Sequence, residues 1–269
     1  MTSDFNLSNV PYAPLAIAHL ASAILLFACL TALWVLSLRR RDASIVDGFW
    51  AIGFSLVSLV SLSCGPAGPR PWLAAACTTL WAARLSFHLI RRNLAHGEDR
   101  RYAAMRKRQG PGFWWKSFFI VFLLQGVLIW VISLPLQHAG TSAAPIGPLD
   151  ALGALLFLAG FVSEALADAQ LEAFKKSPAS AGRVLDTGLW RYSRHPNYFG
   201  NALLWWGLSL FGVATGPWWL FFAPALMTFL LLRVSGVTML EKDIGERRPE
   251  YTEYIRTTSA FVPWPPRIK

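Results

Sequence analysis

The stretch Gly188-Leu-Trp-Arg-Tyr-Ser-Arg-His-Pro-Asn-Tyr-Phe-Gly-Asn201 places ionisable and aromatic side chains between two apolar segments. Charged groups at membrane depth cost several kcal/mol unless they face a protein interior or a wet cavity. Pro196 is tolerated at the start of a helix, and the helix that begins there leaves backbone N–H groups without partners. Such a helix end attracts anions, phosphate above all. The stretch therefore predicts a ligand site at the beginning of a membrane helix.

Around this stretch, the composition is that of an integral membrane protein. Of the 269 residues, 54% are hydrophobic and 15% are charged, whereas about a quarter of a soluble domain is charged. Seven apolar runs reach or approach the ~20 residues that a membrane helix needs: residues 12–38, 45–64, 72–90, 113–137, 149–170, 197–213 and 218–240. We therefore predict an all-α, polytopic bundle of about seven transmembrane helices, which forms a single domain over residues 1–269.

The net charge of +10 is distributed as in a membrane protein, so we expect no nucleic-acid partner. Lys and Arg gather in residues 39–41, 91–108, 175–194 and 242–269, while residues 65–71, 138–148 and 214–217 contain only Arg70. This alternation follows the positive-inside rule and predicts an outside N-terminus and a cytoplasmic C-terminus. Residues 1–10 carry Asp4 and no basic group, so we expect no cleavable signal. We expect a bacterial inner-membrane protein that contacts membrane lipid and needs no obligatory protein partner.

Several common kinds of site do not match the sequence. The three cysteines, Cys29, Cys64 and Cys77, lie in apolar runs without the spacing of a metal site, and the five histidines are scattered. The glycine-rich fingerprints of soluble nucleotide-binding folds and the His-Glu-x-x-His motif do not occur. We therefore predict no metal site.

Asp47 is a carboxylate just inside the second apolar run. It is either a helix cap or a partner for Arg40 or Arg41, or it is a desolvated acid that holds a proton at neutral pH. The sequence leaves both roles open.

Two further apolar runs carry isolated polar groups. Trp81, Arg84 and His88 are spaced by three and four residues, so they share one face of a helix. An arginine one turn from a histidine in an apolar helix is either functional or part of a satisfied core. Gln125 is a lone amide, which bonds either a neighbouring helix or a carbonyl-bearing ligand.

Two charged segments are candidates for binding a phosphorylated cofactor. Residues 91–108 are rich in arginine, including Arg100 and Arg101, and guanidinium groups bind phosphate bidentately. Glu164, Asp168 and Glu172 are spaced by four residues, so their like charges form one stripe. This stripe either pairs internally or accepts hydrogen bonds from a cofactor's ribose or amide. The arginines that would pair with it, or bind the cofactor's phosphates, are Arg183, Arg191 and Arg194.

The segment Arg194-His-Pro-Asn-Tyr-Phe-Gly200 resembles a signature shared by steroid 5α-reductases and isoprenylcysteine carboxyl methyltransferases. The chain resembles the steroid 5α-reductase family, and more closely its bacterial multi-pass relatives, well over the C-terminal half and loosely over the first three helices. Features of the reductases are Leu124-Gln-Gly126, Glu164-x-x-x-Asp168 followed by Lys175, and Arg183-x-x-x-x-Gly-Leu189. This resemblance implies NADPH as the cofactor.

The predicted site residues fall into three groups. For catalysis we name Asp47, Arg84 and His88, and for contact with an apolar substrate Trp50, Trp81 and Gln125. Lys175 stands where the reductases have an arginine, Glu164 where they have an amide, and Asn201 where many relatives have a glutamate. For cofactor binding we name Arg100, Arg101, Glu164, Asp168, Lys175, Arg183, Tyr192, His195, Asn197, Tyr198, Asn201, Arg233 and Glu241.

The expected activity is NADPH-dependent reduction of the C=C bond of a flat apolar enone, such as a 3-oxo-Δ4 steroid. The substrate would enter a cavity among the first four helices, and NADPH would bind among the last three. A protonated Asp47, or Arg84 or His88, would stabilise the charge that develops on the carbonyl oxygen. Two alternatives remain open: an S-adenosylmethionine-dependent methyltransferase of a lipid or prenylcysteine carboxyl, and a non-enzymatic lipid-binding membrane protein.

Overall fold

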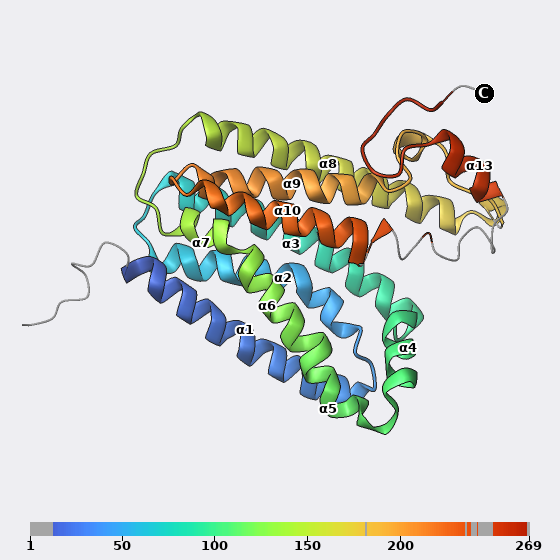
Figure 1. Ribbon diagram of the computed structural model, residues 1–269, viewed down its shortest axis with the longest axis horizontal. Coiled ribbons are helices and arrows are strands. Elements are labelled where there is room, and N and C mark those ends of the chain that lie inside the picture. The colour runs from blue at the N-terminus through green and yellow to red at the C-terminus, as the bar shows by residue number, and fades with distance from the viewer. Residues whose placement is uncertain (1–12, 181, 235, 238–240, 242–249, 268–269) are drawn as a thin grey trace, which may run out of the picture. The chain divides into compact units, whose positions relative to one another are not determined.

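The computed structural model describes residues 13–180, 182–234, 236–237, 241 and 250–267, and within these ranges all regular elements are helices (Figure 1). Tyr12, the segment 1–10, and residues 235 and 238–240 of the seventh predicted run lie outside the described residues. The chain divides into two compact units. Unit 1 comprises Met1–Gly147 and Phe211–Leu220, and unit 2 comprises Pro148–Leu210 and Phe221–Lys269.

Unit 1 is built on long apolar helices followed by shorter ones. Its centre is filled by fully buried side chains, among them Phe54, Trp81 and Phe122. Gly53 lets α2 approach α6, because a Cβ at this position would lie 2.8 Å from Cδ1 of Ile129. The helices are α1 (Ala13–Arg40), α2 (Ile45–Cys64), α3 (Pro69–His96), α4 (Arg100–Gln109), α5 (Phe113–Ser117), α6 (Leu124–Ile132) and α7 (Leu134–Gly140), with a π-helical turn at Phe118–Leu123 between α5 and α6.

Unit 2 pairs two long helices at very close range. A Cβ on Gly200 would lie 2.5 Å from the backbone N of Glu164 and 2.7 Å from the carbonyl of Gly160, so the glycine of the signature permits α8 and α9 to touch. The elements are α8 (Pro148–Lys176), a 3-10 turn at Gly188–Arg191, α9 (Pro196–Val213, in unit 2 up to residue 210), α10 (Phe222–Phe229), a π-helical turn at Leu230–Val234 and α13 (Glu250–Thr257).

Five helices of the described chain are long and apolar enough to cross a membrane: Ala13–Arg40, Ile45–Cys64, Pro69–Asn93, Arg100–Ile132 and Pro148–Lys176. They match the first five predicted runs and support an integral, multi-pass membrane protein. Within the described residues, the last two runs do not meet this requirement. The first six of the 18 residues of α9 include polar Asn197 and Asn201, and the described part of the seventh run forms the shorter apolar helix Trp218–Val234. The all-helical membrane class is confirmed, whereas seven spans and their orientation stay predictions.

Candidate functional site

Unit 1 holds a chain of polar side chains that joins α2, α4 and α6, which we call the Asp47 cluster (Asp47, Arg101, Tyr102 and Gln125). Tyr102 donates a hydrogen bond of 2.6 Å to Oδ1 of Asp47, and Nη2 of Arg101 lies 2.7 Å from Oδ2. Nε2 of Gln125 donates to the Tyr102 hydroxyl at 3.2 Å. The Tyr102 side chain belongs to a buried residue. A carboxylate, a guanidinium, a phenol and an amide are thus linked within a largely apolar unit.

The start of α4 brings Arg101 and Tyr102 to Asp47. Asp99 caps the helix by accepting from the backbone N of Arg101 at 2.9 Å, and it also accepts from Nε of Arg101 at 2.9 Å. Burial alone would raise the pKa of Asp99, but the hydrogen bonds from Arg101 outweigh burial and lower it. A second ion pair, between Nη2 of Arg106 and Oε1 of Glu98 at 2.8 Å, holds the next turn of the helix.

The partner of Asp47 differs from the one that sequence reasoning offered. We named Arg40 or Arg41 as a possible ion-pair partner, but the ion pair forms with Arg101. The chain turns between α1 and α2, and it is α4 that places a guanidinium against the first turn of α2. Arg101 therefore donates to two carboxylates, those of Asp47 and Asp99, whereas the side chain of Arg100 is exposed. The phosphate-binding role predicted for both arginines stays a prediction.

Sequence reasoning missed Tyr102, although it named Asp47 and Gln125. Neither residue is near Tyr102 in sequence, and half of the surrounding residues, Arg100–Gln109, are basic. The one available signal was Asp99, whose position before a helical segment is typical of an N-cap. That cap fixes the register of α4 and so turns Tyr102 inward.

The other residues predicted in unit 1 lie on α2 and α3. Trp50 packs edge-on against Phe54 with ring centroids 5.1 Å apart, and Phe54 lies 5.9 Å from Trp81. The two predicted substrate-binding tryptophans are therefore joined through one phenylalanine, and Trp81 is fully buried. Arg84 and His88 lie on α3, and both are half-buried.

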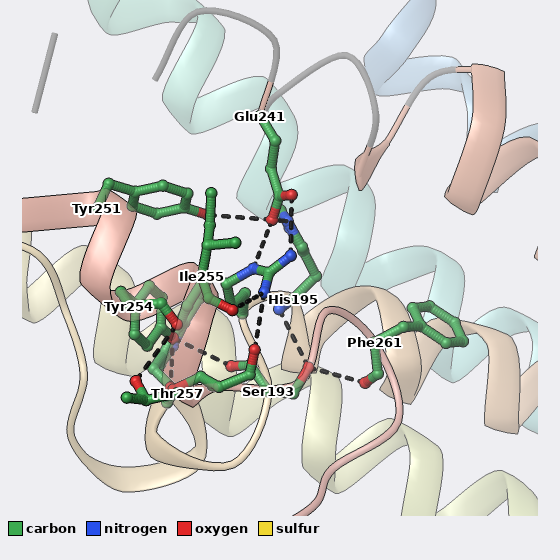
Figure 2. Close-up of polar contacts among 11 residues, drawn as sticks. Ser193, His195, Glu241, Tyr251, Tyr254, Ile255, Thr257 and Phe261 are labelled. Carbon is green, nitrogen blue, oxygen red and sulfur yellow. Dashed lines mark hydrogen bonds and ion pairs between the residues drawn. The ribbon is translucent and has the colours of Figure 1, made fainter. Parts of the chain in front are cut away.

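In unit 2, the signature is organised by Arg194, which we group with His195, Glu241 and Tyr251 as the Arg194 cluster (Figure 2). Nε and Nη2 of Arg194 bind the two carboxylate oxygens of Glu241 at 2.8 and 3.0 Å. Nη1 donates to the carbonyls of Thr258 and Ile255 at 2.7 and 3.1 Å. The guanidinium is thereby fully engaged by protein groups at all three nitrogens.

The same carboxylate orients the neighbouring histidine. Nε2 of His195 lies 3.0 Å from Oε1 of Glu241, and the His195 ring stacks on Tyr198 with centroids 5.7 Å apart. Tyr251 adds a weaker hydrogen bond to Oε1 at 3.3 Å. Burial by itself would raise the pKa of Glu241, but the hydrogen bonds from His195 and Arg194 lower it to about 2. Glu241 is therefore ionised over the physiological pH range.

The C-terminal segment 254–264 is pinned to the signature by backbone hydrogen bonds. The backbone N of Arg194 donates to the carbonyl of Ser259 at 2.8 Å, and that of Trp264 donates to the carbonyl of Tyr192 at 2.9 Å. The hydroxyl of Ser193 donates to the carbonyl of Phe261 at 2.7 Å (Figure 2). Sequence reasoning did not identify these partners, since the paired residues lie more than 60 positions apart.

The acidic stripe of α8 contacts the signature through Asn197, and of the three arginines named as its possible partners, Arg194 pairs with another carboxylate. We offered Arg194 as a partner for the stripe, but its carboxylate partner is Glu241. Instead, Nδ2 of Asn197 donates to Oδ1 of Asp168 at 3.0 Å. Glu172 pairs within its own helix with Lys176 at 2.7 Å.

The remaining residues that we predicted to bind the cofactor differ in how exposed they are to solvent. Glu164 and Asn201 are buried, whereas Lys175, Arg183, Tyr192 and Arg233 are exposed. Arg233 lies in the π-helical turn that follows α10, and such turns are frequent at functional sites. Guanidinium and ammonium groups are well suited to binding phosphate, so the exposed members of this set remain candidates for that role.

The family of the chain follows from comparison with known proteins. Residues 33–258 match the family model described as "Protein of unknown function (DUF1295)". The chain is similar to the uncharacterized protein C594.04c of Schizosaccharomyces pombe, with 30% identity over 260 residues that cover 86% of this chain and 75% of the relative. No solved structure matches it significantly. The chain belongs to the DUF1295 family, which is associated with steroid 5α-reductase-like membrane proteins.

Proposed function

We propose that the protein is an NADPH-dependent reductase of the C=C bond of an apolar enone, with a 3-oxo-Δ4 steroid as the model substrate. The observation that carries this proposal is the phenol–carboxylate contact of the Asp47 cluster, where the Tyr102 hydroxyl lies 2.6 Å from Oδ1 of Asp47. Enone reduction develops negative charge on a carbonyl oxygen, which a hydrogen-bond donor in apolar surroundings stabilises strongly. Methyl transfer has no such requirement.

The roles within the Asp47 cluster follow from its hydrogen bonds. Both oxygens of Asp47 accept, from Tyr102 and from Arg101, which is the pattern of a carboxylate. We assign the donor role to Tyr102: its single hydroxyl proton, which points to Oδ1 of Asp47 in this structure, would turn to the substrate carbonyl oxygen while Gln125 still donates to the hydroxyl oxygen. This assignment moves the donor role from a protonated Asp47, Arg84 or His88 to a residue that is neutral at physiological pH.

In unit 2, we assign the cofactor to the exposed basic groups and the signature. Lys175, Arg183 and Arg233 would hold the phosphates, and Asp168 with Asn197 would bind the ribose or amide groups. Tyr198, which stacks on the buried His195 ring, is half-buried and offers an aromatic surface. NADPH, when bound, would supply the hydride that the β-carbon of the enone accepts, and a proton from solvent or a nearby acid would complete the α-carbon. Arg194 takes no part in phosphate binding, because Glu241 and two carbonyls already occupy it.

We place the protein in a bacterial inner membrane, with seven spans, an outside N-terminus and a cytoplasmic C-terminus. The distribution of Lys and Arg supports this orientation. It puts the signature and the Arg194 cluster on the cytoplasmic side, where NADPH is present. Membrane lipid surrounds the apolar helices and delivers an apolar substrate.

The test is turnover of an enone panel by the purified protein in proteoliposomes, with Asp47→Ala as the diagnostic variant. We expect Asp47→Ala, which removes the carboxylate that positions the Tyr102 hydroxyl, to slow enone reduction by about 100-fold, a loss of the order seen when a transition-state donor is removed, while the Kd for NADPH changes little. The matched control is Ser55→Ala, which removes a buried hydrogen bond to Thr79 in the same unit without touching the cluster. Unchanged turnover in Asp47→Ala would remove the cluster from the reaction. Methyl transfer from S-adenosylmethionine to a prenylcysteine carboxyl, without enone reduction, would replace the reductase by a methyltransferase.

A further inference from the structure

One end of unit 1 carries exposed basic side chains from two helices, which we call the α4 basic surface. Glu98 fastens these helices together, because its Oε1 accepts from the backbone N of Ala43, just after α1, at 2.9 Å and from Nη2 of Arg106 at 2.8 Å. In Figure 1, α4 accordingly lies at the end of unit 1 where α1 finishes. The surface consists of Arg39, Arg40, Arg41, Arg100, Lys107 and Arg108, all of them exposed.

The acidic groups of these segments do not neutralise the surface. Residues 39–42 and 98–116 contain nine basic and three acidic side chains. Asp42 accepts from the backbone N and the hydroxyl of Ser44 at 2.8 and 2.6 Å. Glu98 is paired with Arg106, and Asp99 with Arg101. The acids are therefore directed to partners inside the unit, and the exposed charge that remains is positive.

Exposed aromatic rings lie beside this positive charge. Trp114 and Trp115, at the start of α5, are 58% and 46% exposed. Such exposure of tryptophan is unusual on the surface of a soluble protein but common at the membrane–water interface. The carbonyl of Trp114 accepts from Nε1 of Trp34 near the end of α1 at 3.0 Å, so the rings and the arginines 39–41 belong to the same end of the unit.

We propose that the α4 basic surface binds the headgroups of anionic phospholipids in the surrounding bilayer, with Trp114 and Trp115 at headgroup level. Clusters of four to eight Lys and Arg residues next to a membrane helix attract anionic lipid in this way. The tryptophans favour a lipid over a free phosphate compound, because a soluble anion would leave the exposed rings without an apolar neighbour. The proposal is independent of the reductase function.

The test is competitive lipid binding to the delipidated protein in non-ionic detergent. Phosphatidylglycerol and phosphatidylcholine with the same acyl chains are titrated, and native mass spectrometry counts the bound molecules. The diagnostic variant carries Arg100→Gln, Lys107→Gln and Arg108→Gln. The control carries Lys176→Gln, Arg256→Gln and Arg267→Gln, which removes the same charge from exposed positions of unit 2. Both variants must keep the wild-type melting temperature in detergent.

We expect the wild type and the control to prefer phosphatidylglycerol, and the preference of the diagnostic variant to fall at least about tenfold. Inorganic phosphate should displace the lipid no better than chloride at equal ionic strength. A wild-type preference in the diagnostic variant, or an equal loss in the control, would overturn the proposal. Specific displacement by phosphate would also overturn it, since the site would then recognise a free anion.

Discussion

The two polar clusters are built from the same groups, a carboxylate, an arginine and a tyrosine, yet they differ in what the arginine holds. Arg194 is 9% exposed at its side chain and donates to the backbone of a distant segment as well as to Glu241. Arg101 is 35% exposed and donates to two carboxylates, one of which also receives the Tyr102 hydroxyl. The Arg194 cluster therefore anchors the C-terminal segment to the signature, whereas the Asp47 cluster positions the Tyr102 hydroxyl as a hydrogen-bond donor.

We infer from Arg194 that an arginine within a signature motif can have a structural role and need not contact a ligand. The partners of its nitrogens decide the role: backbone carbonyls indicate a structural anchor, and a side-chain relay ending in a phenol indicates chemistry. Variants of the Arg194 cluster test its structural role, and variants of the Asp47 cluster test its role in catalysis.

The largest effect is expected from Arg194→Ala. The variant leaves the half-buried carboxylate of Glu241 without its bidentate partner and releases two carbonyls of the C-terminal segment. Breaking a fully buried pair costs about 3–5 kcal/mol of unfolding free energy, and we expect a loss near the lower end because Glu241 is only half-buried. Unfolding in denaturant, followed in detergent, measures it. Arg191→Ala, an exposed neighbour, serves as control, and equal stability of the two variants would refute the anchoring role.

Glu241→Gln should change how stability depends on pH. The folded-state pKa of Glu241 is about 2, below its ordinary value of 4.5, so its ionised form stabilises the fold above pH 4.5. This contribution, at most about 3 kcal/mol, is lost as the pH falls from 4.5 through 2. Denaturation at several pH values should show this loss in the wild type and not in Glu241→Gln. Parallel curves for the two proteins would contradict the assignment.

Tyr102→Phe tests the other cluster. It removes the hydroxyl that Asp47 and Gln125 hold, while the buried ring remains. We expect about 100-fold slower enone reduction, with the Kd for NADPH and the melting temperature close to wild type. Steady-state kinetics and a thermal scan check this. A loss of stability without a loss of turnover would make the Asp47 cluster structural, like the Arg194 cluster.

The smallest effect is expected from Gly200→Ala, which tests the close contact between α8 and α9 at the signature. The added methyl would meet backbone atoms of α8, which cannot rotate away, so about 1–3 kcal/mol of stability should be lost. Gly112→Ala is the control, because its Cβ would lie 3.4 Å from the flexible side chain of Lys116. If the two variants unfold alike, α8 and α9 do not depend on this close contact.

The sequence predicted the helices better than the site. Apolarity and its interruption by charge placed α2 at residues 45–64, and Pro196 placed the start of α9. Their isolation within apolar runs also singled out Asp47 and Gln125, and the family resemblance pointed to Glu241. The sequence could not pair them, because Tyr102 is 55 residues from Asp47, and Glu241 is 47 residues from Arg194. Such partners are chosen by tertiary packing, which one helix's pattern does not contain.

The most direct test of the reductase function is product analysis after incubating the proteoliposomes with a 3-oxo-Δ4 steroid and NADPH deuterated at the transferred position. We expect a product in which the C=C bond is saturated, one deuterium is at the β-carbon and the carbonyl is intact. We also expect NADPH, and not S-adenosylmethionine, to raise the melting temperature, because only a ligand of the folded state stabilises it. Stabilisation by S-adenosylmethionine alone, with no saturated product from any enone, would contradict the account.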